Sequence, residues 1–186
     1  MIEEELTREQ ELVERAQRDP KAFGELYDRY YPKIFHYVLG RTADVQLAMD
    51  ITSTTFFKAL TEIKRFHWQG VSFGAWLYRI ATNEVYSHFR KKKNDVTLIE
   101  NMSAVPAEVD PLAEVIEAEE ELERNREFVK LHEKLTELPD KYQEVITLRF
   151  FENKEINDIA EILGKPEGTV KSLIHRGLGK LRIMMA

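Results

Sequence analysis

The sequence predicts an all-α protein with two small helical domains joined by an acidic linker. Glycine and proline number only 8 and 6 among 186 residues, and they mark the breaks between apolar patterns. Apolar residues recur every three or four positions, and no stretch alternates apolar and polar residues over the length of a strand. Around Pro106 this periodicity disappears, which is typical of a linker.

The first domain, residues 1–93, is expected to be a bundle of three or four helices. Thr7 to Gln10 has the spacing of a capping box that begins a short acidic helix. Asp19 followed by Pro20 indicates the cap of a second helix, and Gly40 is expected to end it. Two further helices complete the bundle, one that begins near Asp44 and one from about Phe73 to Lys93.

The linker is expected at residues 94–127 and the second domain at residues 128–186. Asp110-Pro111 indicates the start of a long, Glu-rich helix, and Pro139 ends it. Three shorter helices are expected to follow, at about 140–151, 155–163 and 166–184.

Charge is distributed unevenly along the chain, although the net charge is only -6. Residues 29–93 carry 11 positive and 4 negative groups, and residues 164–186 carry 5 and 1. Between them, residues 94–127 carry 2 positive and 11 negative groups. Two basic segments separated by an acidic one indicate two surfaces that face a polyanion, joined by a segment that avoids it.

The composition excludes several classes of protein. There is no cysteine, so disulfide scaffolds, thiolate metal sites and cysteine nucleophiles are excluded. The histidines show no metal-ligand spacing, and no Gly-rich phosphate loop or nucleophile elbow is present. We therefore expect a protein that is not an enzyme, with no catalytic residue, metal or cofactor. The acidic N-terminus and the lack of a long apolar run predict a cytoplasmic protein without membrane insertion.

A helix-turn-helix is predicted near the C-terminus. Gly164 is expected to supply a turn with positive φ, and Val170 to fill the wedge between the helices with Ile159, Leu163 and Leu173. The second helix presents groups that can reach base edges or phosphates in a major groove: Glu167, Thr169, Lys171, Ser172, His175 and Arg176. A plain helical hairpin with a solvated polar face is the alternative, and the positive charge of this segment favours DNA binding over it.

Residues 64–93 combine aromatic and basic side chains, a mixture that suits unpaired nucleic acid. Unstacked bases lie on aromatic faces while cations follow the phosphates. The residues expected to take part are Lys64, Arg65, Phe66, His67, Trp68, Arg79, Asn83, Tyr86, Arg90, Lys91, Lys92 and Lys93. Trp76 favours a core position because of its helical spacing with Ile80, and the basic run also suits a helix C-terminus.

Together these segments resemble the extracytoplasmic-function (ECF) sigma factors, small promoter-recognition subunits of bacterial RNA polymerase. The resemblance covers residues 22–93 and 135–184, and the chain departs from the usual pattern at Ser53-Thr54, Ser87 and Leu173. It rests on five segments in the family's order: Ala22-Phe23-x-Glu25-Leu26-Tyr27, Asp50-Ile51-Thr52-x-x-Thr55-Phe56-x-Lys58, Trp76-Leu77-Tyr78-Arg79-Ile80-Ala81-x-Asn83, Leu138-Pro139-x-x-Tyr142 and Gly168-Thr169-Val170-Lys171-Ser172.

The resemblance implies that the first domain is sigma region 2 and that the second is sigma region 4, with its helix-turn-helix. Region 2 would capture and help to melt the minus-10 element with the aromatic and basic residues named above. It would bind core RNA polymerase through Asp50, Ile51, Thr52, Thr55, Phe56 and Lys58. Region 4 would read the minus-35 element through the outward groups of its second helix, with Lys165, Lys180 and Arg182 on phosphates.

The resemblance also implies partners and a role for the linker. The expected partners are core RNA polymerase, promoter DNA and an anti-sigma factor, and the protein is expected to be a monomer when free of them. The 34 residues from 94 to 127 span at most about 110 Å when extended. Their acidic groups, which include Glu117, Glu119, Glu120 and Glu121, would mimic nucleic acid in the RNA exit path of the polymerase.

Two other functions remain open on the sequence. A helix-turn-helix transcriptional regulator that acts without polymerase would bind its operator tightly by itself, usually as a symmetric dimer. A pure interaction protein, captured by an inhibitor and without a promoter of its own, would lack the polymerase contact.

Overall fold

All regular elements that the computed structural model describes are helices, which confirms the all-α prediction. The structure describes residues 2–68, 71–95, 130–131 and 133–185. In chain order the elements are α1 (Ile2–Arg18), η1 (Pro20–Ala22), α2 (Phe23–Thr42), α3 (Val45–Glu62), η2 (Ile63–Arg65), α4 (Phe73–Asp95), α6 (Asp140–Ile146), the π-helical turn η3 (Thr147–Phe151), α7 (Ile156–Leu163) and α8 (Glu167–Met185).

The N-terminal bundle consists of α1 to α4 and begins as the local signals predict. The carboxylate of Asp19 accepts a hydrogen bond from the backbone N–H of Lys21 at 2.9 Å, just before α2. The carboxylate of Asp44 accepts from the N–H of Leu47 at 3.0 Å and caps α3. A side-chain acceptor at this position satisfies a backbone donor that the helix leaves unpaired, so these caps fix where the helices begin.

Two expected boundaries in this bundle are wrong. Thr7 lies inside α1, which is already helical from Ile2, so it does not begin a helix. Helix α2 passes through Gly40 and ends at Ala43, whose φ of 52° is left-handed. A Cβ at residue 40 would lie 3.0 Å from Cγ2 of Thr147 in η3, so this glycine allows the second domain to approach α2 closely.

The C-terminal domain contains the predicted helix-turn-helix, formed by α7 and α8. Gly164 ends α7 with a φ of 61°, as expected, and α8 begins directly after Pro166. Ile159 and Val170 are completely buried between the two helices. The helix expected at 140–151 is α6 followed by the π-helical turn η3.

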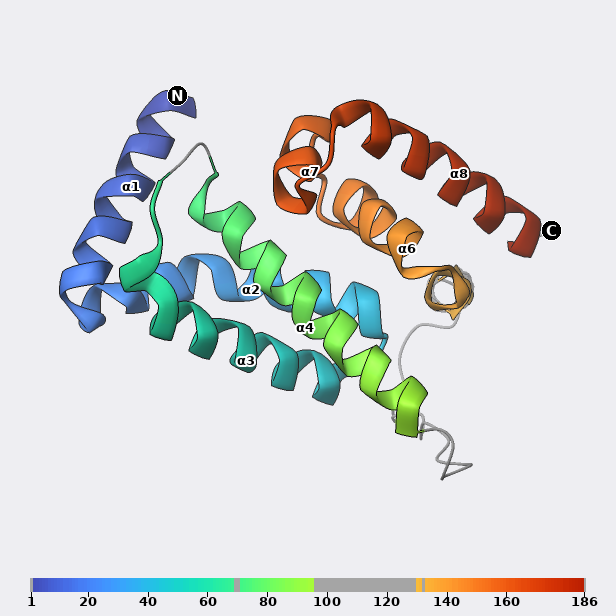
Figure 1. Cartoon of the computed structure of the whole chain (residues 1–186), viewed down its shortest axis with the longest axis horizontal. Helices are drawn as coiled ribbons and strands as arrows, with labels where there is room; N and C mark the ends of the chain where they lie inside the picture. The colour runs from blue at the N-terminus through green and yellow to red at the C-terminus, as the bar shows by residue number, and fades with distance from the viewer. Residues whose placement is uncertain (1, 69–70, 96–129, 132, 186) are drawn as a thin grey trace, which may run out of the picture.

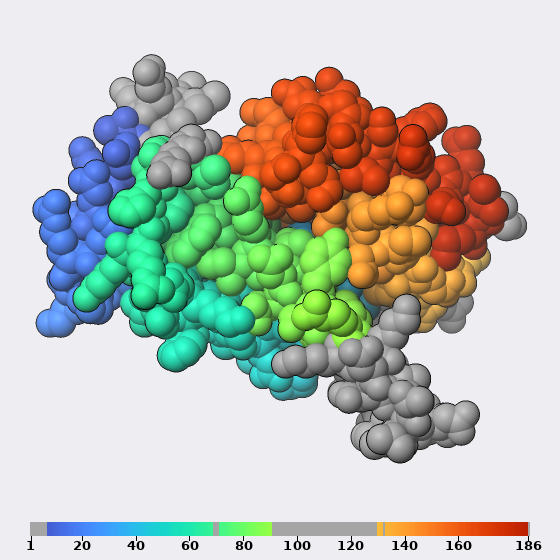
Figure 2. Space-filling model, viewed as in Figure 1, coloured from blue at the N-terminus to red at the C-terminus, as the bar shows by residue number. Residues whose placement is uncertain are grey.

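The two domains pack against each other around α4. Figure 1 shows α6, α7 and α8 gathered on one side of α4, and Figure 2 shows the domains meeting along a continuous surface. Helix α4 contacts α7, η3 contacts α2, and one cluster of buried apolar residues extends through both domains. The predicted linker lies almost entirely outside the described residues, as do Glu117 and Glu119 to Glu121. No helix in the described part of the chain is long and apolar enough to cross a membrane.

Substitution of two glycines in α8 should have opposite effects on stability. A Cβ at Gly177 would meet Cδ1 of Ile146 at 2.9 Å and Cβ of Tyr142 at 3.2 Å, whereas one at Gly179 would meet nothing within 4 Å. Gly177→Leu is therefore expected to lower the free energy of unfolding by about 1–3 kcal/mol through overpacking. Gly179→Leu is expected to raise it by up to about 0.8 kcal/mol through helix propensity. Urea unfolding of both variants measures the difference, and equal effects would contradict the close α6–α8 contact.

Candidate nucleic-acid interface

The second helix of the helix-turn-helix presents a polar face to solvent. Nine side chains are expected to contact the minus-35 element, and eight of them are exposed on this helix. The exposed ones are Glu167, Thr169, Lys171, Ser172, His175, Arg176, Lys180 and Arg182. The ninth, Lys165, precedes the helix and is half-buried. Leu173, one of the departures from the family pattern, is buried in the domain core. This face therefore has the exposure and the polar groups that a recognition helix needs in a major groove.

A second candidate surface lies where η2 and the loop after it meet α4. A cavity of about 520 Å³ opens here, and we call it the base cavity. It is lined by Lys58, Glu62, Arg65, Phe66, Trp76, Ile80, Asn83 and Glu84. The structure thus brings together three residues expected from the sequence, Arg65, Phe66 and Asn83.

The walls of the base cavity offer a ring, an amide and a cation. The half-buried ring of Trp76 lies 5.0 Å from the buried ring of Phe66, measured between centroids. Asn83 is exposed, and its amide can donate and accept hydrogen bonds at once. The side chain of Arg65 is 84% exposed and pairs with Glu62 at 3.1 Å. Trp76 therefore packs against the core and also lines the cavity. Its spacing with Ile80 and Asn83 on one helix face could have indicated this second role.

The remaining predicted minus-10 residues lie at three different places. Lys64 is exposed in η2, His67 is exposed on the loop after it, and Trp68 is half-buried on that loop. Arg90 is exposed near the end of α4, and the side chains of Lys91, Lys92 and Lys93 lie outside the described residues. Arg79 and Tyr86 face the C-terminal domain.

Arg79 and Tyr86 are engaged by the C-terminal domain. The guanidinium of Arg79 donates from Nε to the carbonyl oxygen of Ile162 at 3.2 Å and from Nη2 to that of Glu161 at 2.8 Å. The hydroxyl of Tyr86 donates to the carboxylate of Glu144. We call this arrangement of the two domains the closed form. In it, two residues expected at DNA are bound to protein groups.

Two carboxylates of the C-terminal domain, the buried Glu144 and the half-buried Glu152, accept hydrogen bonds from tyrosines of α4. Besides the Tyr86–Glu144 contact, the hydroxyl of Tyr78 donates to Oε2 of Glu152 at 2.8 Å. Burial raises the pKa of both glutamates above the ordinary value, and the tyrosine hydrogen bonds only partly oppose this. Burial also raises the pKa of both tyrosines, so each hydroxyl keeps its proton and remains a donor.

The closed form should become more favourable as the pH falls. The closed form binds protons at Glu144 and Glu152 more tightly than an open form, in which both carboxyls are hydrated and have their ordinary pKa. Enclosing the two carboxylates in their ionised form costs free energy. This cost applies in full at a pH above their raised pKa values, and it falls as the pH drops through those values because the carboxyls take up protons. Below the ordinary pKa of a glutamate, the free-energy advantage of the closed form over the open form no longer grows, because the carboxyls are protonated in both forms. Small-angle scattering of the free protein should show a smaller radius of gyration at pH 5.5 than at pH 8, and expansion on acidification would contradict this.

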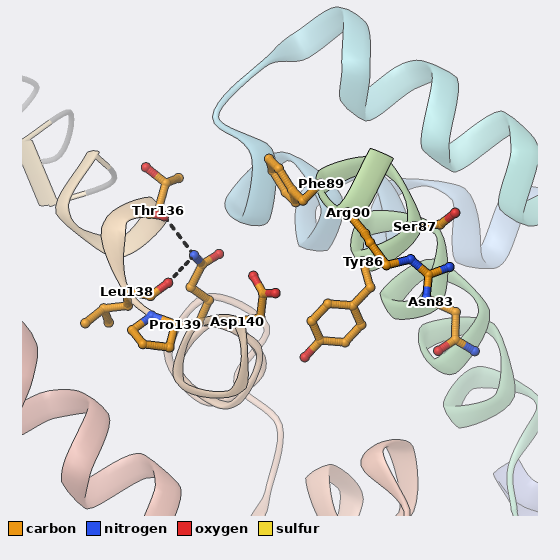
Figure 3. Close-up of a pocket in the computed structure, with 10 residues that line it drawn as sticks. Asn83, Tyr86, Ser87, Phe89, Arg90, Thr136, Leu138, Pro139 and Asp140 are labelled. Atoms are coloured by element: carbon orange, nitrogen blue, oxygen red, sulfur yellow. Dashed lines mark hydrogen bonds between the residues drawn. The ribbon is translucent and has the colours of Figure 1, made fainter. Parts of the chain in front are cut away.

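The closed form leaves a groove between α4 and the beginning of α6 (Figure 3). Its volume is about 750 Å³, and it is lined on one side by Asn83, Tyr86 and Arg90 and on the other by Pro139 and Asp140. Asn83 lines both this groove and the base cavity. Arg79, Asn83, Tyr86 and Arg90 thus lie along the line where the two domains meet.

Four of the six side chains expected to contact core polymerase are buried in the N-terminal bundle: Ile51, Thr52, Thr55 and Phe56. They pack α3 inside the domain, which corrects the expectation that they form a contact surface. Asp50 and Lys58 are exposed, and Nζ of Lys58 pairs with Glu84 at 2.6 Å.

The outer face of α3 carries apolar side chains that the sequence analysis missed. Phe57 is 71% exposed, and Val45, Met49 and Leu60 on the same helix are also exposed. We call these four residues the α3 apolar face. Exposed apolar residues that follow one helix are typical of an interaction surface. Their separations of four, eight and three residues place them on one side of a helix and were the available signal, but such a pattern is equally consistent with burial.

The molecule combines a helical bundle that has an aromatic cavity with a helix-turn-helix that has an exposed polar face. These two features define a two-domain DNA-binding protein. Residues 26–94 match Sigma-70 region 2, and residues 128–181 match Sigma-70 region 4. The chain belongs to the ECF sigma factors, within the sigma-70 family. This confirms the predicted class, a promoter-specific initiation factor of RNA polymerase, and does not favour the regulator that acts without polymerase.

Individual relatives agree with this assignment. The ECF RNA polymerase sigma factor BldN of Streptomyces coelicolor is 37% identical over 92% of this chain, which spans 63% of the length of BldN. The ECF RNA polymerase sigma factor SigW of Bacillus subtilis is 34% identical, and the match covers 88% of this chain and 89% of SigW.

Solved structures show the same fold. The structure of CnrH in complex with the cytosolic domain of CnrY matches this chain with a TM-score of 0.67 and 21% sequence identity. The match covers 95% of this chain and 96% of the matched chain. The structure of the sigma factor RpoE in complex with the anti-sigma factor NepR, from Bartonella quintana, matches with a TM-score of 0.65 and 24% sequence identity. This match covers 89% of this chain and 97% of the matched chain. No group of three or more His, Asp or Glu residues that could hold a metal ion occurs among the described residues.

Proposed function

We propose that this chain binds core RNA polymerase through the α3 apolar face, captures an unpaired base of the minus-10 element in the base cavity, and reads the minus-35 element with α8. The observation that carries the proposal is the convergence of Arg65, Phe66 and Asn83, from two separate segments, on one cavity beside Trp76. The division of the chain into residues 1–93, 94–127 and 128–186 follows these tasks.

The chemistry of the base cavity suits a base taken out of the stack. The rings of Trp76 and Phe66 offer an apolar surface, and the Asn83 amide can read the edge of a base. Arg65, on the exposed rim, can exchange its bond with Glu62 for a phosphate. Melting is then driven by binding, because the cavity stabilises the unpaired base, and no catalytic group takes part.

Binding to both promoter elements requires the closed form to open. The two elements lie about 25 base pairs apart, on the order of 85 Å along the duplex at 3.4 Å per step. In the closed form α7 lies against α4 and holds Arg79. Polymerase therefore acts on this chain by stabilising separated domains as well as by positioning them.

Regulation by an anti-sigma factor forms part of the proposal. One structural neighbour, RpoE, is a sigma factor in complex with an anti-sigma factor, and another, CnrH, is in complex with the cytosolic domain of CnrY. We propose a cytoplasmic protein that is not an enzyme and whose partners are core polymerase, promoter DNA and an anti-sigma factor.

The test of this function is run-off transcription from a genomic fragment library with purified bacterial core polymerase, with and without this protein. Salt-sensitive initiation at selected fragments only when both are present is the expected result. Tight, core-independent binding of the protein to DNA would replace the proposal with the regulator.

Asn83→Ala should reduce open-complex formation about 10-fold or more, because one good base contact contributes about 1–3 kcal/mol. Its affinity for core polymerase should not change, since Asn83 lies on α4 and outside the α3 apolar face. Asn157→Ala, which removes an exposed amide on α7, is the matched control and should behave like the wild type. Permanganate reactivity of unpaired thymines measures the open complex, and equal signals from the two variants would count against the base cavity.

A further inference from the structure

The loop that follows η2 is held in place by α1. The side-chain Nε2 of Gln17 donates hydrogen bonds to the carbonyl oxygens of Ile63 and Phe66, at 3.0 and 2.7 Å. The Phe66 ring is buried, and its centroid lies 6.1 Å from that of Trp68. Two bonds to main-chain carbonyls and a buried ring hold the chain at Ile63 and Phe66, so cavities beside Phe66 are formed before any ligand arrives.

A second cavity, of about 440 Å³, opens between α1 and this loop. It is lined by Gln10, Val13, Glu14, Gln17, Phe66, His67 and Trp68. Phe66 lines this cavity and the base cavity alike, so the two cavities adjoin the same ring. Neighbouring nucleotides of one unpaired strand could therefore place their bases in the two cavities.

The lining of this second cavity favours one class of base. The exposed ring of His67 and the half-buried ring of Trp68 offer a stacking surface beside the buried Phe66, and α1 supplies the polar groups. Nε2 of Gln10 lies 3.4 Å from Oε1 of Glu14, so the amide orients the carboxylate. An ionised carboxylate only accepts hydrogen bonds. Adenine, cytosine and guanine present amino groups to such an acceptor, whereas thymine presents carbonyl oxygens on both sides of its single N–H.

Charge determines which part of the strand can approach α1. Residues 1–28 carry 4 positive and 9 negative groups, which repel phosphates. Lys64 and Arg65 are exposed in η2, directly before the loop. The backbone of a bound strand would follow these cations, and only an uncharged base would enter beside Glu14.

We propose that the second cavity binds an unpaired base of the non-template strand, next to the base in the base cavity, and that Glu14 makes this subsite select a base with an amino group. The inference rests on the proposed function and adds a specificity determinant to it. Helix α1 lies before residue 26, where the match to Sigma-70 region 2 begins, so that match does not assign the subsite.

The test uses the full chain with core polymerase on a promoter library randomised across the minus-10 element. Initiation-competent sequences are selected with the wild type, Glu14→Gln, Asn83→Ala and the control Glu11→Gln, which changes an exposed α1 carboxylate outside the cavity. The wild type should discriminate against thymine at one position adjacent to the position that depends on Asn83. Glu14→Gln should reduce this discrimination at least fivefold, because an amide both donates and accepts. It should leave all other positions and the affinity for core polymerase unchanged.

The outcomes separate the two proposals. A Glu14→Gln profile identical to that of the wild type, or a change at the position that depends on Asn83, would overturn the second subsite and leave the proposed function standing. A wild type that initiates nowhere with core polymerase would overturn both. Glu11→Gln must match the wild type, since an equal effect there would assign the change to the general charge of α1.

Discussion

The variant Tyr78→Phe/Tyr86→Phe should open the closed form of the free protein. Each substitution removes the hydroxyl that donates to a carboxylate at the domain interface, the half-buried Glu152 or the buried Glu144, and leaves that carboxylate without this donor. Loss of such a charged hydrogen bond costs about 1.5–3 kcal/mol. Two losses of this size should shift the balance between closed and open forms by roughly 100-fold or more, at 1.4 kcal/mol per factor of 10.

The measurement is the distance between the domains. Because the chain has no cysteine, cysteines introduced at Arg18 and Lys180 can carry a pair of fluorophores for energy transfer. Transfer should fall in the double variant. Tyr27→Phe, which removes a partly exposed hydroxyl of α2, should not change it.

A second variant decides whether the buried carboxylates or the shape of the interface controls opening. Glu144→Gln/Glu152→Gln removes the buried charges but keeps groups that can accept from the tyrosines, so it should stay closed and lose the dependence on pH. A compact Tyr78→Phe/Tyr86→Phe protein, or an open Glu→Gln protein, would contradict the roles given to these pairs.

Phe57→Asp should weaken binding to core polymerase by roughly 30-fold or more. Phe57 is the most exposed residue of the α3 apolar face, and a central aromatic residue of an interface often contributes 2 kcal/mol or more to binding. A charge at this position also disfavours contact with an apolar partner surface. The stability of the free protein should change little, because the Phe57 side chain is largely in solvent.

Titration of labelled protein with core polymerase measures this loss. Met49→Asp, on the same face, should show a smaller loss in the same direction. Ile183→Asp replaces another highly exposed apolar residue, on α8, and should change the affinity only a few-fold. Equal losses from Phe57→Asp and Ile183→Asp would mean that the α3 apolar face is not the main contact.

Local signals in the sequence predicted much of the fold because they act within one turn of a helix. Asp19, Asp44 and Gly164 fix helix ends through their own side-chain or backbone geometry, and all three act as expected. The prediction that Gly40 ends a helix was wrong because the role of this glycine is not local. The absence of a Cβ leaves room for Thr147, which is more than a hundred residues away in the sequence. Gly177 is similar, since its space is filled by Tyr142 and Ile146 of α6.

The candidate sites were predictable in type but less so in arrangement. The outward face of α8 follows from helix periodicity once Val170 is placed in the wedge, and the exposures agree with it. On α3 the family motif names positions without saying which of them face the core. It indicates Phe56, which is buried, whereas the neighbouring Phe57 is exposed. That Arg79 and Tyr86 bind Glu161, Ile162 and Glu144 depends on the packing of the two domains, which no short segment encodes.

The buried cluster shared by the two domains also bears on how long an active molecule survives in a cell. When α4 separates from α7 and α2 separates from η3, buried side chains become exposed to solvent. Examples are Tyr78 and Leu148, which are almost completely buried in the closed form. An open molecule without a partner therefore offers proteases and chaperones the surfaces that they recognise. In the proposed function, polymerase would cover the open molecule, whereas closing hides the same surfaces in the free one. Turnover would then fall on molecules that have left the polymerase and not yet closed, which limits how long a burst of initiation outlasts its signal.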